Sequence, residues 1–568
     1  MGGLIIIMIK ITGNRLEIQT KTLLAIMENG FIVSIKSKQT GEEFIDGADS
    51  NNGSALELIY KRNEAISVSA GEMCKITVFK LNDYMVELRF NNWNADGILM
   101  VSEDIETGDL MIEPSAFSSR PGVRSCRYNI KGFRKDLRCI APLNQGCDMD
   151  FEDSLIAGRR SAWPYSWEAG LCMAQGKDSG LWIHTEDTQY KFKTMTVGAC
   201  GDKHGYAFES DNYGPIEDLM SAGGLVWRIN VYKGDWHVPA TLYRDWLWKA
   251  FNLEKEEQYR PEWLKDLSLA ISWCPTDIKM LEALSKKVDP KRVLLHLPNW
   301  RIYNYDEDYP IFKPSDKARE FVAKCKELGY HVMPHCTSME IDPSLDIFNI
   351  FNDFSIRELE SGRREGWSWV SGNAGLGVPG SDLALTTHKA NKVMIKIHTA
   401  FPMWQSILRE NIGYAADELN LENIFIDVTL CTYNARMGLV NNMPTTQGLI
   451  KELKLLQTIG NGKPLYVGGE GLNEISMQGL CFAQAHLMNR DNGDTQLRTG
   501  KNDLNAFLFG RLTRTIGHSD LHGRNENSEK FMQSHIEHGA IPTITIGGTN
   551  DIENPTPAVK RILETAAE

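Results

Sequence analysis

The sequence lacks the features that would place it in a membrane or nucleic-acid-binding class. No run approaches the roughly 20 apolar residues that a membrane-spanning helix needs. Basic residues are in deficit, 61 against 74 acidic ones, and the formal net charge is −13. A phosphate backbone and an anionic membrane both attract a basic face. We therefore expect neither nucleic acid nor a membrane as a partner.

Paired cysteine motifs are also missing. The 11 cysteines are odd in number, and none lies in a CxxC pair. This usage is typical of reduced thiols in the cytosol rather than of a disulfide framework. The first residues, MGGLIIIMIKITG, hold only six apolar residues before Lys10 and no small-residue cleavage site, so they indicate a first strand and not a signal peptide. We expect a cytoplasmic protein, or a secreted one if a signal sequence has been removed.

What the sequence does contain is a change of pattern near residue 235. Its 568 residues exceed one compact core and predict two or three domains. Short alternating runs such as RLEIQT, KITVFKL and LVWRINVY, separated by Gly, Asn and Asp turns, predict an antiparallel β-sandwich over residues 1–234. Within it, the Trp-rich segment 162–187 is either sandwich core or a loop over an active site. Helical spacing in DWHVPATLYRDWLWKAFN, before Pro261, predicts a linker helix over 235–261.

After the linker, strand and helix patterns alternate. Strands are predicted at Leu267–Trp273, Val293–Pro298, His331–Pro334, Asn423–Asp427, Pro464–Gly468 and Ile541–Ile546, with the sixth and seventh near Ala485–Asn489 and Ile516–Ser519. Helices are predicted after most of them, including Ser315–Leu328 and Thr445–Ile459, the latter with a Thr-Thr cap. The pattern predicts a (β/α)8 TIM barrel over residues 262–568. The expected fold class is therefore multidomain, an N-terminal β-sandwich followed by an α/β barrel.

Two of the predicted strands run directly into a carboxylate. NIFIDV ends near Asp427 and PLYVGGE ends in Glu470, and the carboxyl ends of barrel strands face one site. A retaining glycosidase holds a carboxylate nucleophile and a carboxylic acid roughly 5 to 5.5 Å apart, and an inverting one holds them farther apart. The short Asp427 suits a fixed nucleophile, and Glu470, between Gly469 and Gly471, suits an acid that reaches a leaving group. The alternative is that both acids cap helices or pair with arginines.

A sandwich before a barrel, an Asp ending strand four, a Glu ending strand five and the element IGHSD near strand seven resemble the α-amylase-like superfamily of retaining α-glycosidases. The likeness is greatest to the endo-α-N-acetylgalactosaminidase type. It implies Asp427 as nucleophile, Glu470 as general acid/base, and Asp520 with His518 as substrate-binding or transition-state-stabilising groups. One departure stands out: α-amylases have an Arg two residues before the nucleophile, where this chain has Phe425.

Three further residues are candidates for sugar contact. Trp273 and Trp300, at or after the first two strands, could stack on a pyranose face or pack at the rim. His335 follows strand three, where it could bind a hydroxyl or serve a structural role. The 59 residues from Ser338 to Lys396 form an unusually long connection, and such connections are commonly functional.

The main hypothesis is an α-glycosidase that needs no cofactor or metal and takes an oligosaccharide or glycoside as its substrate. It would act on an α-galactoside, an α-N-acetylgalactosaminide or an α-glucoside. Two alternatives remain open. In the first, His518, Asp520 and His522 hold a divalent metal together with Asp427 and Glu470, in an isomerase or aldolase. In the second, the protein binds carbohydrate without catalysis. The sequence predicts no oligomeric state.

Overall fold

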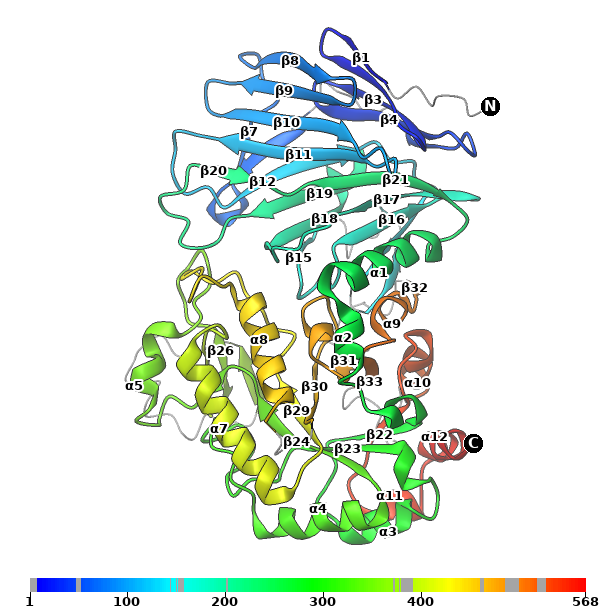
Figure 1. The fold of residues 1–568 in the computed structure, drawn as a ribbon, viewed down its shortest axis with the longest axis vertical. Helices are drawn as coiled ribbons and strands as arrows, with labels where there is room; N and C mark the ends of the chain where they lie inside the picture. Colours follow the sequence, from blue (N-terminus) through cyan, green and yellow to red (C-terminus); the bar gives the residue numbers. More distant parts are fainter. Residues whose placement is uncertain are drawn as a thin grey trace. The chain divides into compact units, whose positions relative to one another are not determined.

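The structure is a computed structural model of the 568-residue chain, shown as a ribbon in Figure 1. It describes residues 8–46, 53–143, 145–149, 151, 158–200, 203–370, 373–376, 378, 392–459, 464–485, 500–517 and 528–568. Two compact units are formed, one from Met1–Phe251 with Arg498–Gly500 and one from Asn252–Leu497 with Lys501–Glu568. Of the helices in the ranges just given, none is both long and apolar enough to cross a membrane.

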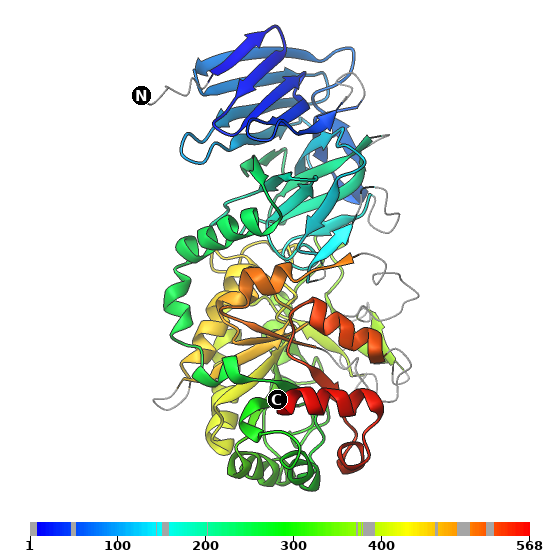
Figure 2. The ribbon, with the colours of Figure 1, turned by 90° about the vertical axis from the view of Figure 1, so that its right-hand side faces the viewer.

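The first unit is built from antiparallel sheets. One sheet has the order β1-β2-β3-β4-β5, and Figure 2 shows it in dark blue as a layer on the strands that follow. Its strands are β1 (Met8–Thr12), β2 (Arg15–Gln19), β3 (Leu23–Glu28), β4 (Phe31–Ser37) and β5 (Glu43–Asp46). A second sheet has the order β15-β18-β19-β12-β6-β7. Its strands are β15 (Arg160–Ala162), β18 (Lys193–Cys200), β19 (Lys203–Asp211), β12 (Ser125–Lys131), β6 (Leu56–Ile59) and β7 (Ala65–Ser67).

The longest sheet has the order β32-β14-β13-β16-β17-β21-β11-β10-β9-β8, with β20 beside β11. Its strands are β32 (Gly500–Lys501), β14 (Cys147–Met149), β13 (Arg138–Ala141), β16 (Leu171–Gln175), β17 (Ser179–His184), β21 (Trp227–Lys233), β11 (Leu110–Phe117), β10 (Asp96–Glu103), β9 (Met85–Asn91), β8 (Lys75–Asn82) and β20 (Ser221–Gly223). Alternation explains the strands: in β10 every second residue, from Gly97 to Glu103, is buried. The predicted antiparallel β-sandwich is confirmed.

The Trp-rich segment belongs to the core of this unit. Trp167 is fully buried and stacks on Trp227, with ring centroids 6.3 Å apart. Trp163 and Trp182 are also buried, whereas Tyr165 is half exposed. Helix α1 (His237–Phe251) ends the unit and lies inside the range predicted to be a linker. A short 3-10 helix, η1 (Lys61–Asn63), connects β6 to β7.

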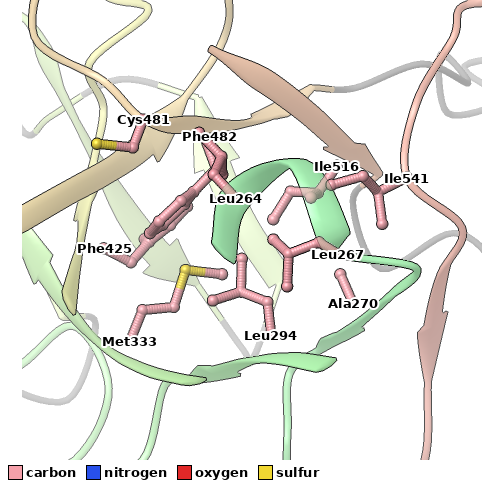
Figure 3. Packing of buried hydrophobic residues seen from close by; sticks show 10 residues of the cluster. All are labelled: Leu264, Leu267, Ala270, Leu294, Met333, Phe425, Cys481, Phe482, Ile516 and Ile541. Carbon is pink, nitrogen blue, oxygen red and sulfur yellow. The ribbon is translucent and has the colours of Figure 1, made fainter. Parts of the chain in front are cut away.

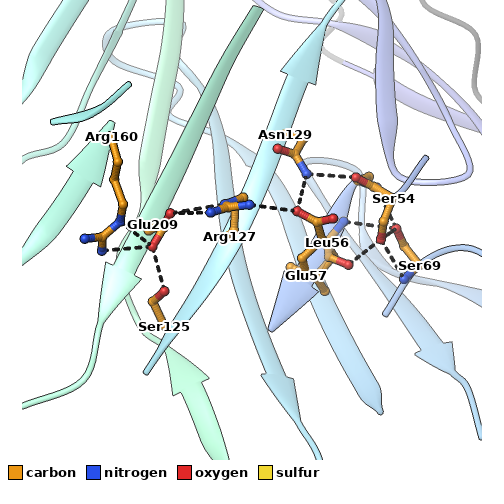
Figure 4. Close-up of polar contacts among 10 residues, drawn as sticks. Ser54, Leu56, Glu57, Ser69, Ser125, Arg127, Asn129, Arg160 and Glu209 are labelled. Atoms are coloured by element: carbon orange, nitrogen blue, oxygen red, sulfur yellow. Dashed lines mark hydrogen bonds and ion pairs between the residues drawn. The ribbon is translucent and has the colours of Figure 1, made fainter. Parts of the chain in front are cut away.

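A buried ion network joins the strands of the second sheet (Figure 4). The carboxylate of Glu209, on β19, has no exposed side-chain surface and accepts hydrogen bonds from Arg127 (2.8 Å), Arg160 (3.0 Å) and the hydroxyl of Ser125 (2.7 Å). Arg127 also contacts Glu57 at 3.4 Å. Because charged donors cover both of its oxygens, Glu209 remains ionised although burial alone would neutralise it.

The second unit contains a nearly closed parallel barrel. Its eight strands in the described ranges have the hydrogen-bonded order β33-β31-β30-β29-β24-β23-β22-β34. They are β22 (Leu269–Ser272), β23 (Val293–Leu297), β24 (His331–Thr337), β29 (Asn423–Asp427), β30 (Tyr466–Glu470), β31 (Phe482–Ala485), β33 (Arg514–Gly517) and β34 (Thr543–Thr545). A bridge between Ile516 and Ile541 joins the ends of the series. This confirms the predicted α/β barrel.

The barrel strands differ from their predicted positions in detail. The sixth strand, β31, ends at Ala485, where the prediction began, and the rest of the predicted range lies outside the described residues. The seventh, β33, begins two residues before the predicted Ile516. Both strands are only four residues long, too short to leave a period in the sequence.

Helices cover the outside of the barrel, as Figure 1 shows for α4, α7 and α8. In α4 (Asp316–Leu328), the Ser315 hydroxyl accepts from the Ala318 N–H at 3.2 Å, and Gly329 ends the helix in the left-handed region. The helix α8 (Thr445–Gln457) departs from the prediction because Pro444 occupies its N-cap position. The hydroxyl of Thr445 instead donates to the carbonyl of Tyr433.

The other helices of this unit are α2 (Leu253–Glu257), η2 (Glu262–Asp266), α3 (Ile278–Leu284), η3 (Pro290–Arg292), α5 (Phe348–Phe351), η4 (Asn352–Phe354), α7 (Pro402–Leu419), η6 (Ser476–Gln478), α9 (Leu504–Phe509), α10 (Ser528–Glu537), α11 (Thr549–Glu553) and α12 (Pro557–Ala567). The segment between β24 and α7 forms a small antiparallel sheet of order β25-β28-β26-β27. Its strands are β25 (Glu340–Ile341), β28 (Met394–Lys396), β26 (Gly366–Val370) and β27 (Asn373–Leu376). We call it the insertion sheet.

The barrel interior is apolar up to Phe425 and polar beyond it. Figure 3 shows the apolar cluster, which comprises Leu264, Leu267, Ala270, Leu294, Met333, Phe425, Cys481, Phe482, Ile516 and Ile541. Phe425 contacts the imidazoles of His296 and His335 at centroid distances of 4.6 and 5.3 Å. These histidines begin the polar layer at the carboxyl ends of the strands.

Candidate active site

Asp427 and Glu470 lie together at the carboxyl ends of β29 and β30. The parallel register pairs Ile426 with Gly469, so the next residue of each strand is one of the two acids. Both side chains are largely buried, at 7% and 8% exposure. Glu470 is among the groups that lower the pKa of Asp427, so the two side chains interact. The structure therefore brings the predicted pair together at adjacent strand ends.

The backbone of Glu470 is fixed by Thr429. The Thr429 hydroxyl accepts from the Glu470 N–H at 2.8 Å and donates to the Glu470 carbonyl at 2.6 Å. The glycines on either side permit this approach: a Cβ at Gly469 would lie 2.5 Å from the same hydroxyl, and one at Gly471 would lie 2.4 Å from Leu430. The two glycines seen in the sequence thus serve close packing around the acid.

Asp427 is held by the neighbouring third strand. Its carbonyl accepts from both the N–H (3.2 Å) and the hydroxyl (3.0 Å) of Ser338. The next residue, Val428, has φ +63°, a region that a β-branched side chain rarely adopts. Trp273, at the end of β22, also has a positive φ of +53°. Backbone strain of this kind gathers at functional sites, and here both residues lie at carboxyl ends of barrel strands.

A chain of hydrogen bonds sets the tautomers of two histidines. The backbone N–H of Trp273 donates to Nδ1 of His296 (3.3 Å), so the proton of His296 is on Nε2. This Nε2–H donates to Nδ1 of His335 (3.0 Å). The Nε2–H of His335 then faces Oδ2 of Asp427 at 3.5 Å, an electrostatic contact longer than an ordinary hydrogen bond. Burial, and then the neighbouring His335, lower the pKa of His296, which keeps it neutral.

The electrostatics favour an ionised Asp427. Burial raises the pKa of Asp427, but the electrostatic attraction of His335 and the interaction with Glu470 outweigh it, and the net direction is downward. Paired-carboxylate catalysis requires one carboxylate that stays ionised, and the surroundings of Asp427 favour that state.

The other predicted residues occupy different environments. His335 is buried and contacts Asp427 directly. Trp273 is half buried, with its ring 5.0 Å from that of Tyr305. Trp300 is fully buried, stacks on Phe312 and donates from Nε1 to the carbonyl of His335 at 2.8 Å, so it packs in the interior and supports His335. The predicted substrate-binding residues His518 and Asp520, with His522, lie outside the described residues.

Sequence reasoning missed a second layer of polar groups. Asp306, in the connection after β23, is 1% exposed and accepts from the Trp369 indole at 2.6 Å. Glu340, on β25, is fully buried and accepts from the Thr337 hydroxyl at 3.1 Å. Both acids interact electrostatically with Asp427. The signal for the first was the acidic and aromatic run YNYDED after the second strand.

One buried lysine also reaches this layer from the insertion sheet. Lys396 is the register partner of Glu340 and donates from Nζ to the Tyr433 hydroxyl at 2.7 Å. Its ammonium lies 5.1 Å from the ring centre of Trp367, a cation–π arrangement. Elsewhere in the described ranges, as here, no group of three or more His, Cys, Asp or Glu side chains is arranged to hold a metal ion.

The sequence matches a family model described as "Domain of unknown function (DUF6259)" over residues 225–442. The matched range includes Asp427 and ends before Glu470. A comparison with curated protein sequences gives no match.

Solved structures of similar fold are glycoside hydrolases. The ligand-free α-N-acetylgalactosaminidase NagBb from Bifidobacterium bifidum is 12% identical, with a TM-score of 0.65 over 98% of this chain and 93% of that one. Its GalNAc complex is 11% identical, with a TM-score of 0.67 over 98% and 92%. A GH31 family sulfoquinovosidase from E. rectale is 10% identical, with a TM-score of 0.55 over 98% and 82%. At these identities the likeness establishes the shared fold.

Proposed function

We propose that the protein is a glycoside hydrolase that cleaves an α-linked sugar by a retaining double displacement. The observation that carries this proposal is the pair of buried acids, Asp427 and Glu470, at matching carboxyl ends of neighbouring barrel strands. A retaining enzyme holds its carboxyls roughly 5 to 5.5 Å apart and an inverting one roughly 6.5 to 9.5 Å apart, and interacting side chains on adjacent strand ends favour the shorter separation. The fold shared with NagBb and the sulfoquinovosidase supports the same reading.

In the proposed mechanism Asp427 attacks the anomeric carbon while Glu470 gives its proton to the leaving oxygen. The resulting glycosyl-enzyme ester is hydrolysed by water, which Glu470 deprotonates as it returns to the acid form. His335 contributes by holding the Asp427 carboxylate in its charged form and in one orientation. The His296 and Trp273 bonds fix the tautomer that points an N–H at that carboxylate.

The glycone is the finer part of the proposal. We expect an α-galactoside, an α-N-acetylgalactosaminide or an α-glucoside, and NagBb, which shares the fold, is an α-N-acetylgalactosaminidase. The sulfoquinovosidase, with the same barrel, accepts a different sugar, so the glycone must be read from the site and from experiment.

A panel of aryl α- and β-glycosides tests the proposal. Activated aryl leaving groups need little acid catalysis, so release of the chromophore reports the glycone directly. We expect turnover of at least one of the three aryl α-glycosides and none of the β-anomers. Turnover of β-glycosides alone would reject the α-specific assignment. Binding of sugars without any turnover would favour a carbohydrate-binding protein.

A further inference from the structure

Asp306 and Glu340 are buried acids with unused hydrogen-bonding capacity next to Asp427. One oxygen of each is occupied, by the Trp369 indole for Asp306 and by the Thr337 hydroxyl for Glu340. The other oxygens, Oδ1 of Asp306 and Oε1 of Glu340, are buried and have no hydrogen-bond partner among the described residues. A buried polar atom without a partner is costly, so a ligand or water must meet it.

The anchors of the two acids place these oxygens at the level of the proposed nucleophile. Thr337, which holds Glu340, is the register partner of Asp427 across β24 and β29. Asp306 lies in the connection after β23, the strand beside β24, and interacts electrostatically with Asp427 and His335. The ring of Tyr305, the residue before Asp306, lies 5.0 Å from the ring of His335, which contacts Asp427.

The cations near these acids are already engaged by the protein. Arg301 donates to the backbone carbonyls of Glu307, Ile311 and Asn304 and lies over the ring of Tyr309 at 4.2 Å. Lys396 donates to Tyr433 and lies between the rings of Trp367 and Tyr433. The groups left to meet a ligand are therefore carboxyl groups, which bind hydroxyls, and the ionised ones repel anions.

We propose that Asp306 and Glu340 recognise the hydroxyl groups of the glycone, and that they select a neutral polyhydroxylated sugar over one that carries a carboxylate or sulfonate. This inference rests on the proposed function only in taking the surroundings of Asp427 as the sugar site. A neutral ring supplies hydroxyls that donate to Oδ1 and Oε1. An anionic substituent supplies acceptors alone and meets the negative charge of Asp427 and Asp306 in a buried setting.

The test compares matched neutral and anionic ligands. Glu470→Gln protein serves as the background, because it keeps the Asp427 charge and should hydrolyse methyl glycosides about 10²- to 10⁴-fold more slowly than the wild type. Calorimetric titration at pH 7 measures the affinities of methyl α-D-galactopyranoside and methyl α-D-glucopyranoside against the corresponding 6-carboxylates. We expect the better neutral ligand to bind about 10-fold or more tightly than its uronate, as for hydrogen bonds to charged groups.

Added variants assign the selectivity to the two acids. Asp306→Asn and Glu340→Gln should each weaken the neutral ligand and bring the neutral-to-uronate ratio closer to one. Asp346→Asn, exposed and in the connection that also holds Glu340, should leave both affinities unchanged. Uronates that bind as tightly as the neutral sugars, or neutral sugars that do not bind, would overturn the inference. If the wild type turns over no aryl glycoside, the proposed reaction is contradicted instead. The binding test and the turnover test can therefore fail separately.

Discussion

Two buried groups of carboxyls, one in each unit, are organised in opposite ways. In the sandwich, Glu209 receives two arginines and a hydroxyl, and both of its oxygens are satisfied. In the barrel, Asp306 and Glu340 each keep an oxygen without a hydrogen-bond partner among the described residues, and they neighbour a further acid, Asp427. Carboxyls whose oxygens all have donors stabilise a fold, whereas buried carboxyls that keep an oxygen without a donor indicate a site for a ligand and for chemistry.

The largest effect is expected on the barrel side, at Asp427. Asp427→Asn keeps the shape and removes the charge of the nucleophile, so kcat/KM on the best aryl α-glycoside should fall by several orders of magnitude. The melting temperature should stay close to that of the wild type, because the lost interaction belongs to the transition state. Residual activity within tenfold of the wild type would place the nucleophile elsewhere.

The next effect separates the role of Glu470 from that of Asp427. Glu470→Gln should slow substrates with poor leaving groups by about 10²- to 10⁴-fold, which is the usual contribution of general acid catalysis, and activated aryl glycosides by much less. The measurement is kcat/KM across a series of leaving groups of falling acidity. Equal losses along the series would remove Glu470 from the acid role.

In the sandwich, the corresponding substitution of Glu209 should lower stability and leave the rate of hydrolysis unchanged. Glu209→Gln removes the charge that Arg127 and Arg160 share and leaves them only Glu57 and Asp211 as acidic partners, and losing one partner of a buried ion pair costs up to about 3 to 5 kcal/mol. Urea unfolding at pH 7 measures this loss. Glu113→Gln, on an exposed position of β11, is the control and should change little. An unchanged free energy of unfolding in Glu209→Gln would mean that the network adds no stability.

The pH dependence of Glu209 follows from its direction of shift. Burial opposes its ionisation, but the two arginines lower the pKa of Glu209 below the usual value for Glu. Its contribution to stability is therefore complete above the unfolded pKa and is lost as the pH falls through the folded one. The difference in free energy of unfolding between the wild type and Glu209→Gln should therefore shrink at acid pH.

The smallest effect is on stability at Asp306, and its pH dependence has the opposite sign to that of Glu209. Burial, and the charge of Asp427, raise the pKa of Asp306 to about 6, above its unfolded value, although the Trp369 hydrogen bond opposes this. The wild type therefore loses stability as the pH rises from about 4 to about 6. Asp306→Asn removes this loss and should be more stable above pH 6, by on the order of 2 kcal/mol. Unfolding measured at pH 4 and pH 7 checks the sign, and parallel pH profiles for the two proteins would contradict it.

The sequence predicted those parts of the site that lie on regular elements. Asp427 and Glu470 follow continuous apolar strands, and the position of a strand end in a barrel fixes where its next side chain lies. Asp306 and Glu340 were missed because their positions depend on tertiary anchors, the Trp369 indole and the Thr337 hydroxyl, which leave no periodic trace.

The same reason explains the errors in the fold. The short strands β31 and β33 are placed by their neighbours in the barrel, so the pattern misjudged where they begin. The ring of Trp300 was ambiguous in sequence because stacking on a sugar and packing on Phe312 both need an aromatic residue after the second strand.

Trapping of the covalent intermediate tests the central claim most directly. A 2-deoxy-2-fluoro or difluoro α-glycosyl fluoride of the preferred glycone should slow the second displacement, and peptide mass spectrometry should then locate the sugar ester. We predict a label on Asp427 in the wild type and none on Asp427→Asn. A label on another carboxylate would contradict the account, and so would inversion of the anomeric centre detected by NMR.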